Sequence, residues 1–357
     1  MGLLELERLK NYSYEIGPIR PPSEGGSHSL LIRATRNCPW NLCKFCYGTP
    51  YHRERFQLRS VNEIKRDIDS AKTICELLEI IAKKLGGIDR VVGVINPHYL
   101  ENYQSVINVF NWLRFSSRSV FLQDADSLIM PIKNLLQVLR YLKQTFPNIK
   151  RITSYARSKT LTQKTKTLDK LKELQKAGLS RLHVGLETGD DELLKYINKG
   201  VTSEEHILAG RKIKEAGLEL SEYWMPSLGG KALSKQHALN TARVLNAINP
   251  DFIRSRRFLP HMGTPLFDDW KKGVFDLLTP HEVLNEIKIM VMNLDITGKV
   301  CFDHANNPAF RLGSSYTWLF KQDYNGYQFP DEKSNVLNIL KKGLEIDESL
   351  YISRRFR

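Results

Sequence analysis

The middle of the chain repeats one pattern, in which a short apolar run typical of a strand is followed by a stretch with helical spacing. Strands are expected at about 119–124, 150–156, 181–187, 218–224 and 250–258. Two of the intervening helices end in Ala-Gly-Leu, at 177–179 and 216–218, and each passes directly into a strand. Because strands joined by crossover helices run parallel, the pattern predicts an α/β fold whose parallel sheet is covered by helices, open or closed into a barrel.

The segments around this repeat extend the same scheme. A first strand is expected at about 29–35, and a helix at 60–86 that begins at Ser60 and closes at Gly86. Over 161–177, leucines recur near helical spacing among many lysines, which predicts one amphipathic helix with a solvated basic face. We expect an irregular lead-in over 1–27, a main domain over 28–270 and an extension over 271–357 that packs on it.

Three of the five cysteines, Cys38, Cys43 and Cys46, lie within nine residues directly after the first expected strand. Three thiolates can hold three irons of a cubic iron–sulfur cluster and leave the fourth open to another ligand. Structural zinc is the alternative and needs a fourth ligand, for which His28 and His52 are the nearest candidates. The cluster is favoured because zinc sites usually come as two spaced ligand pairs.

The remaining cysteines, Cys75 and Cys301, are solitary and are expected to be structural. Neither the odd cysteine count nor the clustering resembles a secreted disulfide framework. No run has the length of a membrane span, and the first residues carry charges where a signal peptide would be apolar. These features predict a cytoplasmic protein. The net charge of +14 fits a nucleic-acid partner, an anionic cofactor or simply a basic proteome.

Polar and glycine-rich segments follow the expected strands. They are Asp124-Ala-Asp126-Ser127, Ser154–Arg157, Glu187–Asp190, Tyr223, Ser227–Gly230 and His304–Asn307. In parallel α/β folds reactive groups gather at the C-terminal edge of the sheet, so these segments are candidate site residues. His304, Asn306 and Asn307 fit either a substrate contact or a surface turn.

Arginines crowd the sixth expected strand of the repeat. Arg254 and Arg256 alternate with Ser255 and Arg257, so that one of the two pairs is expected to point inward. A charge that faces inward without an anionic partner is costly, which argues either for an acidic substrate or for exposure at the strand end.

The cysteine run, with the aromatic Phe45 directly before its last cysteine, resembles the radical S-adenosylmethionine (SAM) superfamily. The stretch from Val184-Gly-Leu-Glu187-Thr-Gly to Lys199-Gly resembles the fourth strand and following helix of that family. The resemblance covers about residues 29–265 and is nearest to the branch with oxygen-independent coproporphyrinogen oxidase and the Elongator catalytic subunit. The chain departs from the family in placing four residues, rather than three, between Cys38 and Cys43.

The resemblance implies a partial (β/α)6 barrel, similar to a TIM barrel, with helical extensions at both ends. It implies a [4Fe-4S] cluster on Cys38, Cys43 and Cys46, and SAM as the second cofactor. In the family pattern Glu187 contacts the ribose, Lys199 the carboxylate, and the loop with Asp124 and Asp126 the amino group. The cofactor-binding residues expected are Phe45, Asp124, Asp126, Arg157, Glu187, Lys199 and Tyr223.

The function implied is cleavage of SAM to a 5'-deoxyadenosyl radical that abstracts hydrogen from a substrate. The partner would be a one-electron reductant of the flavodoxin or ferredoxin type. The substrate class stays open between a small anionic metabolite and an RNA base. Two other classes also remain, a zinc-stabilised nucleic-acid-binding protein and a noncatalytic iron–sulfur carrier.

Overall fold

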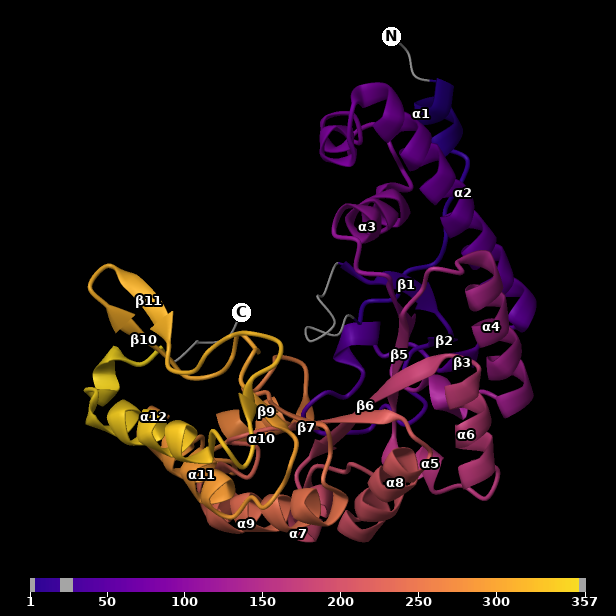
Figure 1. The fold of residues 1–357 in the computed structure, drawn as a ribbon. Coiled ribbons are helices and arrows are strands. Elements are labelled where there is room, and N and C mark those ends of the chain that lie inside the picture. Colours follow the sequence, from indigo (N-terminus) through magenta and orange to yellow (C-terminus); the bar gives the residue numbers. More distant parts are fainter. Residues whose placement is uncertain (1–3, 20–27, 353–357) are drawn as a thin grey trace. The chain divides into compact units, whose positions relative to one another are not determined.

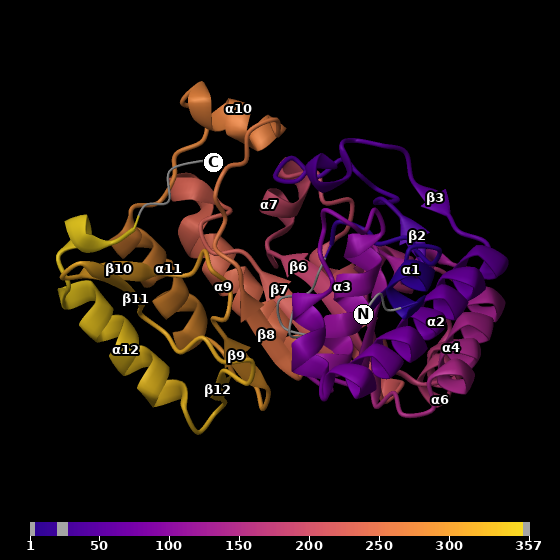
Figure 2. The ribbon, with the colours of Figure 1, turned by 90° about the horizontal axis from the view of Figure 1, so that it is seen from above.

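The computed structural model describes residues 4–19 and 28–352, and it divides into two compact units (Figures 1 and 2). The first unit comprises Met1–Pro39, Arg55–Ala156 and Asp169–Arg181, and the second comprises Trp40–Glu54, Arg157–Leu168 and Leu182–Arg357.

Three parallel strands form the sheet of the first unit, in the order β1-β4-β5. They are β1 (Leu30–Arg33), β4 (Ser119–Gln123) and β5 (Arg151–Ala156). Every residue of β4 is buried, because helices cover a parallel sheet on both faces, and this explains its unbroken apolar run. The helices of this unit are α1 (Leu4–Leu9), α2 (Val61–Leu85), α3 (Tyr103–Arg114), α4 (Ile132–Thr145) and α6 (Leu168–Lys176), with short 3-10 turns η4 (Ile88–Gly93) and η5 (Ser127–Ile129).

The two ends of helix α2 are fixed by capping residues that can be recognised in the sequence. The Ser60 side chain accepts from the backbone N–H of Glu63, and the Glu63 side chain accepts from the backbone of Ser60. Gly86 ends the helix in the left-handed conformation that glycine adopts without strain. The buried face of α2 packs against α4, beside which it lies in Figure 1. The expected helix over 60–86 is therefore confirmed.

The second unit continues with strands in the order β6-β7-β8-β9-β12. They are β6 (Leu179–Glu187), β7 (Glu219–Trp224), β8 (Phe252–Ser255), β9 (Lys299–Cys301) and the antiparallel β12 (Tyr327–Gln328). The helices are α5 (Ser158–Leu161), α7 (Asp191–Tyr196), α8 (Ser203–Glu215), α9 (Gly230–Ile248), α10 (Pro265–Lys271), α11 (Pro280–Met292) and α12 (Lys333–Glu345), with 3-10 turns η3 (Thr49–Tyr51) and η6 (Glu348–Leu350).

Two small antiparallel pairs lie outside the main sheet. Strands β2 (Thr35–Arg36) and β3 (Gln57–Leu58) pair at the base of the cysteine loop, and β10 (Ala309–Leu312) pairs with β11 (Ser315–Trp318) as a hairpin. Across the described residues the main sheet has eight strands and is mostly parallel. The α/β class expected from the alternating pattern is confirmed.

Two expected elements are wrong in extent. The helix expected over 161–177 begins only at Leu168, as α6, because the chain between α5 and α6 is not helical. Lys166 in that intervening stretch is only 2% exposed rather than solvated. Threonines are poor helix formers, and Thr162 bonds its hydroxyl to the carbonyl of Lys159 (3.0 Å). The strand expected over 250–258 ends at Ser255, because its partner β7 ends at the paired residue Trp224.

The lead-in expected to be irregular contains helix α1, while its residues 20–27 lie outside the described part of the chain. In the described ranges, no helix joins enough length to enough apolar character to cross a bilayer.

Candidate functional site

The cysteine loop is anchored to the second unit by backbone hydrogen bonds. The Lys44 N–H donates to the Ile197 carbonyl (2.8 Å), and the Lys44 carbonyl accepts from the Leu266 N–H (3.1 Å). The N–H groups of Cys46 and Tyr47 both donate to the Cys43 carbonyl, at 3.0 and 2.7 Å. The backbone that carries Cys43 and Cys46 is thus held in a tight turn between α7 and α10.

The additional residue between Cys38 and Cys43 is accommodated by contacts with the segment after α7. Asn41 has a φ of 56°, a left-handed conformation that asparagine tolerates better than most residues. The Trp40 indole N–H donates to the Asn198 carbonyl (2.7 Å), and its ring lies so close to Gly200 that a Cβ there would collide with it. The longer spacing is therefore a packed feature of the loop.

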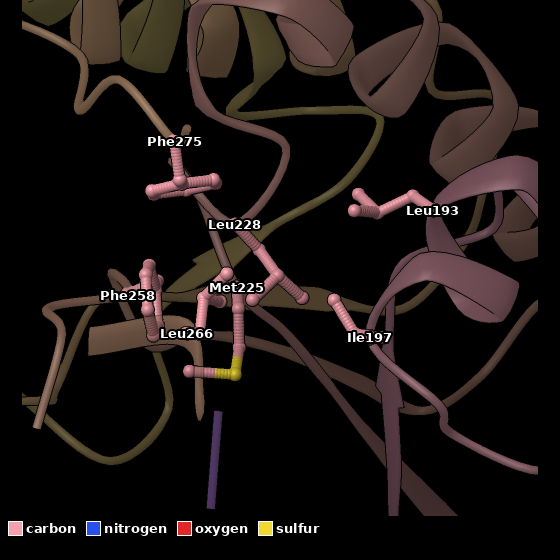
Figure 3. Packing of buried hydrophobic residues seen from close by; sticks show 7 residues of the cluster. All are labelled: Leu193, Ile197, Met225, Leu228, Phe258, Leu266 and Phe275. Atoms are coloured by element: carbon pink, nitrogen blue, oxygen red, sulfur yellow. The ribbon is translucent and has the colours of Figure 1, made fainter. Parts of the chain in front are cut away.

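Phe45 joins the loop to an apolar cluster of the second unit. Its ring packs against the buried cluster that Figure 3 shows, which consists of Leu193, Ile197, Met225, Leu228, Phe258, Leu266 and Phe275. The cluster draws on α7, α10 and the segments that follow β7 and β8. Through Phe45, the residue directly before Cys46, the loop is joined to the apolar interior of this unit.

The five cysteines fall into two groups. Cys38, Cys43 and Cys46 are partly exposed, whereas Cys75 and Cys301 are buried, and burial raises the pKa of each buried thiol to about 12. Buried thiols stay protonated and are poor ligands, so the three partly exposed thiols of the loop are the ones available to bind a metal. Among the described residues, no group of three or more His, Cys, Asp or Glu side chains is already gathered as a metal site.

Glu187 and Lys199 form a nearly buried ion pair, with Oε1 and Nζ 3.0 Å apart. Glu187 has a φ of 63°, and the Thr188 N–H reaches across it to the Leu186 carbonyl (2.8 Å). This is a strained turn of the kind that clusters at functional sites. Burial lowers the pKa of Lys199, but the charges of Glu187 and Cys43 outweigh it, so that its pKa lies above the ordinary value.

Arg157 and Phe45 complete a group around this pair. The Arg157 guanidinium donates to the Lys199 carbonyl (2.9 Å) and lies 5.3 Å from the Trp40 ring centre. The Lys199 ammonium lies 5.6 Å from the ring centre of Phe45. Four of the expected cofactor-binding residues are therefore brought together in the second unit, next to the cysteine loop.

Gly185 of β6 leaves the space in which the Glu187 and Lys199 side chains meet. A Cβ at this position of β6 would collide with the Glu187 carboxylate and approach the Lys199 ammonium within 3.1 Å. Only glycine leaves the space that the two charged side chains occupy.

Glu222 of β7 is a residue of this region that the sequence did not single out. It is fully buried, and neither carboxylate oxygen has a hydrogen-bond partner. Burial and the charge of Glu187 raise its pKa well above the ordinary value, although Lys199 acts in the opposite direction. Burial thus favours the neutral, protonated form of the Glu222 side chain. Its neighbour Tyr223, an expected site residue, is buried with its ring centre 6.1 Å from that of His183.

The turn Ser227–Gly230 is organised by Glu286 of α11. The buried Glu286 carboxylate accepts from the Ser227 N–H and the Ser234 hydroxyl, each at 2.5 Å. Burial raises its pKa to about 7. His237, 4.0 Å away, donates or accepts at the Thr188 hydroxyl (2.7 Å), which ties this turn to the segment after β6.

The two expected aspartates belong to the first unit. Asp124 is buried and accepts from the Arg33 guanidinium at 2.6 Å, while burial raises its pKa and Arg33 lowers it. Asp126 is buried at the start of η5, and its side chain does not cap that turn. Asp124 is thus already committed to an ion pair.

The arginines near β8 do not follow the expected alternation. Arg254 and Arg257 are buried and Arg256 is exposed, because regular strand geometry stops at Ser255. Arg254 pairs with Asp303 at 2.6 Å.

The residues after β9 differ in their surroundings. Asn307 is buried and exchanges two 2.9 Å hydrogen bonds with Ser255, so it is structural rather than part of a surface turn. His304 is half-buried and accepts from the Asn306 N–H at 3.1 Å.

Comparison with known proteins identifies relatives of one kind. Residues 32–245 match the family described as the radical SAM superfamily. Two curated relatives, both named tRNA uridine(34) acetyltransferase, come from Methanocaldococcus jannaschii and Methanocaldococcus infernus. Each is 26% identical over 118 residues, which is 33% of this chain and only 22% of the relative. The archaeal Methanocaldococcus infernus Elp3 structure, with an N-terminal deletion, has a TM-score of 0.45 at 16% identity, over 63% of this chain and 54% of that one.

The family match extends over more than half of the chain and contains the cysteine loop, Glu187 and Lys199. The chain belongs to the radical SAM superfamily, whose members use a [4Fe-4S] cluster and S-adenosylmethionine.

Proposed function

We propose that the chain is a radical SAM enzyme that holds a [4Fe-4S] cluster on Cys38, Cys43 and Cys46. The observation that carries the proposal is the packing of the cysteine loop against Arg157, Glu187 and Lys199 within the second unit. When bound, the reduced cluster and SAM together supply a 5'-deoxyadenosyl radical able to abstract hydrogen from a substrate. The donor set fits, since three partly exposed thiols stand apart from two buried ones.

The ion pair of Glu187 and Lys199 would act by exchanging partners. Lys199 and Arg157 supply two cations to the carboxylate of SAM, and Glu187 supplies an acceptor to the ribose hydroxyls. Glu187 and Lys199 are already nearly desolvated, and their mutual bond satisfies both charges until SAM arrives. Little reorganisation is then needed on binding, because the strained backbone of Glu187 fixes where its carboxylate points.

The apolar cluster against which Phe45 packs would shield the reaction from water. A radical must be kept from water and from other reactive groups, and a closed apolar wall does this. The cluster in Figure 3, against which Phe45 packs, is an apolar wall available next to Cys46 in the chain.

Reconstitution tests this function directly. The full chain is loaded anaerobically with iron and sulfide, reduced with dithionite and given SAM, and 5'-deoxyadenosine is assayed. Product is expected from the wild type and from Cys75→Ala, whose thiol is buried in α2, and none from Cys43→Ala. A well-loaded cluster without product would refute the proposal in favour of a noncatalytic carrier, and purified protein with zinc and no iron would favour the nucleic-acid-binding alternative.

An RNA base is a second candidate substrate. It is supported by the name of the curated relatives, tRNA uridine(34) acetyltransferase, and by the net charge of +14. Binding of tRNA should weaken steeply with salt, because phosphate contacts release counterions. Lack of binding even at low salt would leave the small anionic metabolite as the candidate.

A further inference from the structure

A small hollow of the second unit is lined by a buried arginine. Its walls include Arg257, Leu259, Asn306 and Ile352, and it is partly open to solvent, with a cavity volume of only about 10 Å³, about the space of one water molecule. Arg257 is only 8% exposed. A buried charge of this kind is normally paired.

The Arg257 guanidinium has no such pairing among the described residues. Its Nε is buried without a hydrogen-bond partner, and no carboxylate lies within salt-bridge distance. Burial lowers the pKa of Arg257, and the negative charge of Glu286 raises it by less. The pKa of Arg257 therefore lies below its ordinary value. Arg254, three residues earlier, also has a buried Nε without a partner and is more deeply buried than Arg257, but its guanidinium bonds Asp303.

The hollow lies at the edge of the sheet where ligands bind in parallel α/β folds. Strands β7, β8 and β9 pair in parallel, so their carboxyl ends share one edge. Arg257 follows β8, and Asn306 follows β9. The Met225 N–H, just after β7, donates to the Glu187 carbonyl (3.0 Å), so the proposed SAM-binding group lies at the same edge.

From the buried unpaired guanidinium in this hollow, we propose that Arg257 is a binding residue for an anionic group, a carboxylate or a phosphate, of the substrate. The term substrate rests on the proposed function, whereas the anion site stands on its own geometry. The planar guanidinium matches both groups through paired N–H donors. Burial strengthens the bond, because little water competes for it.

The test is the thermal midpoint of the full chain, Tm, measured with inorganic phosphate in one arm and acetate in the other. Potassium chloride keeps the ionic strength constant. A ligand that binds only the folded chain raises Tm in a saturable way. At least one anion should do so for the wild type and for Arg256→Met, a control that changes the adjacent exposed arginine.

In Arg257→Met the anion affinity should fall about tenfold or more, because a charge-assisted bond is lost. Without anion, this variant should melt at or above the wild-type Tm, since methionine removes an unpaired buried charge and keeps the apolar stem. A rise in Tm that survives in Arg257→Met, or that is absent from the wild type with both anions, would overturn the proposal.

Should Arg257→Met not fold, Arg257→Lys carries the test. Lysine keeps the charge but not the paired donors, so about a tenfold loss of affinity is expected. Unchanged affinity in that variant would equally overturn the proposal. Because Tm requires neither cluster nor SAM cleavage, a chain that makes no 5'-deoxyadenosine still tests the anion site.

Discussion

The two units treat buried charge differently. In the first, Arg33 bonds both Asp124 and Glu15, at 2.6 and 2.7 Å, and Arg59 bonds Asp67 at 2.6 Å. In the second, Arg254 bonds Asp303 in the same way, but Glu222 and Arg257 are buried without a bonded counterion among the described residues. The paired Glu187 and Lys199 lie beside the cysteine loop. A paired network costs little in the folded chain, whereas an unpaired charge persists at the expense of stability.

This difference separates positions that hold the fold from positions available to ligands. Asp124 was expected to meet the amino group of SAM, yet its bond to Arg33 makes it part of the paired network. Among the described residues, Lys199 forms its ion pair with Glu187. Both side chains are proposed to bind SAM. The predictions below test whether pairing does distinguish the two roles.

Lys199→Met should have the largest effect. It leaves Glu187 buried without a partner, which costs about 3–5 kcal/mol of unfolding free energy. Lys199→Met combined with Glu187→Gln should recover most of that loss but not 5'-deoxyadenosine formation, which should stay about 100-fold down because two charge-assisted contacts are lost. Urea unfolding and the product assay measure the two effects. Recovery of activity in the double variant would make the pair purely structural, and Lys195→Met on the exposed side of α7 is the control.

Asp124→Asn should act on stability. The variant leaves Arg33 with one carboxylate fewer in a nearly buried site, and a loss of about 3 kcal/mol is expected in urea unfolding. The KM for SAM should change little. A raised KM with unchanged stability would instead place Asp124 at the cofactor, and the comparison between the units would fail.

The contribution of Glu286 to stability should fall as pH rises from about 5 to 7. Its folded pKa of about 7 exceeds the ordinary 4.5, so the native state binds the extra proton and loses this advantage as the proton leaves. The loss is on the order of 3 kcal/mol and levels off above pH 7. Arg257 and His237 face this carboxylate. Burial lowers the pKa of His237 to about 4, so this histidine adds stability as pH rises and works in the opposite direction. The measurement is therefore the difference in unfolding free energy between the wild type and Glu286→Gln, and a difference that stays constant from pH 5 to 7 would contradict the assignment.

Sequence predicted the parts of the fold that local chemistry controls. The Ser60 and Gly86 caps define α2, and the strands of the repeat appear where apolar runs stand between helices. The prediction from sequence failed where the end of an element depends on a neighbouring strand or on side-chain hydrogen bonds. Strand β8 stops because β7 stops, and the threonines between α5 and α6 break a helix that the leucine spacing had favoured.

The same limit applies to the site. Phe45, Arg157, Glu187 and Lys199 were expected from the family resemblance, and the structure brings them together. The unpaired charges were harder to find. Arginine or glutamate in a strand pattern signals nothing until the groups around it are known, and those around Arg257 come from as far along the chain as Ile352.

Glu222→Gln should have the smallest effect and gives the sharpest contrast with Asp124→Asn. Because burial keeps Glu222 protonated, glutamine replaces a neutral acid of nearly the same shape, and the unfolding free energy at pH 7 should change by less than about 1 kcal/mol. Because the pKa of Glu222 is raised in the folded state, the wild type loses stability as pH rises toward that pKa. Glu222→Gln cannot ionise at this position, so its unfolding free energy should fall less over the same pH range. Urea unfolding at pH 7 and at pH 9 measures both. A loss at pH 7 as large as that of Asp124→Asn would mean that Glu222 is ionised and paired, so that buried charge in the second unit is organised as it is in the first.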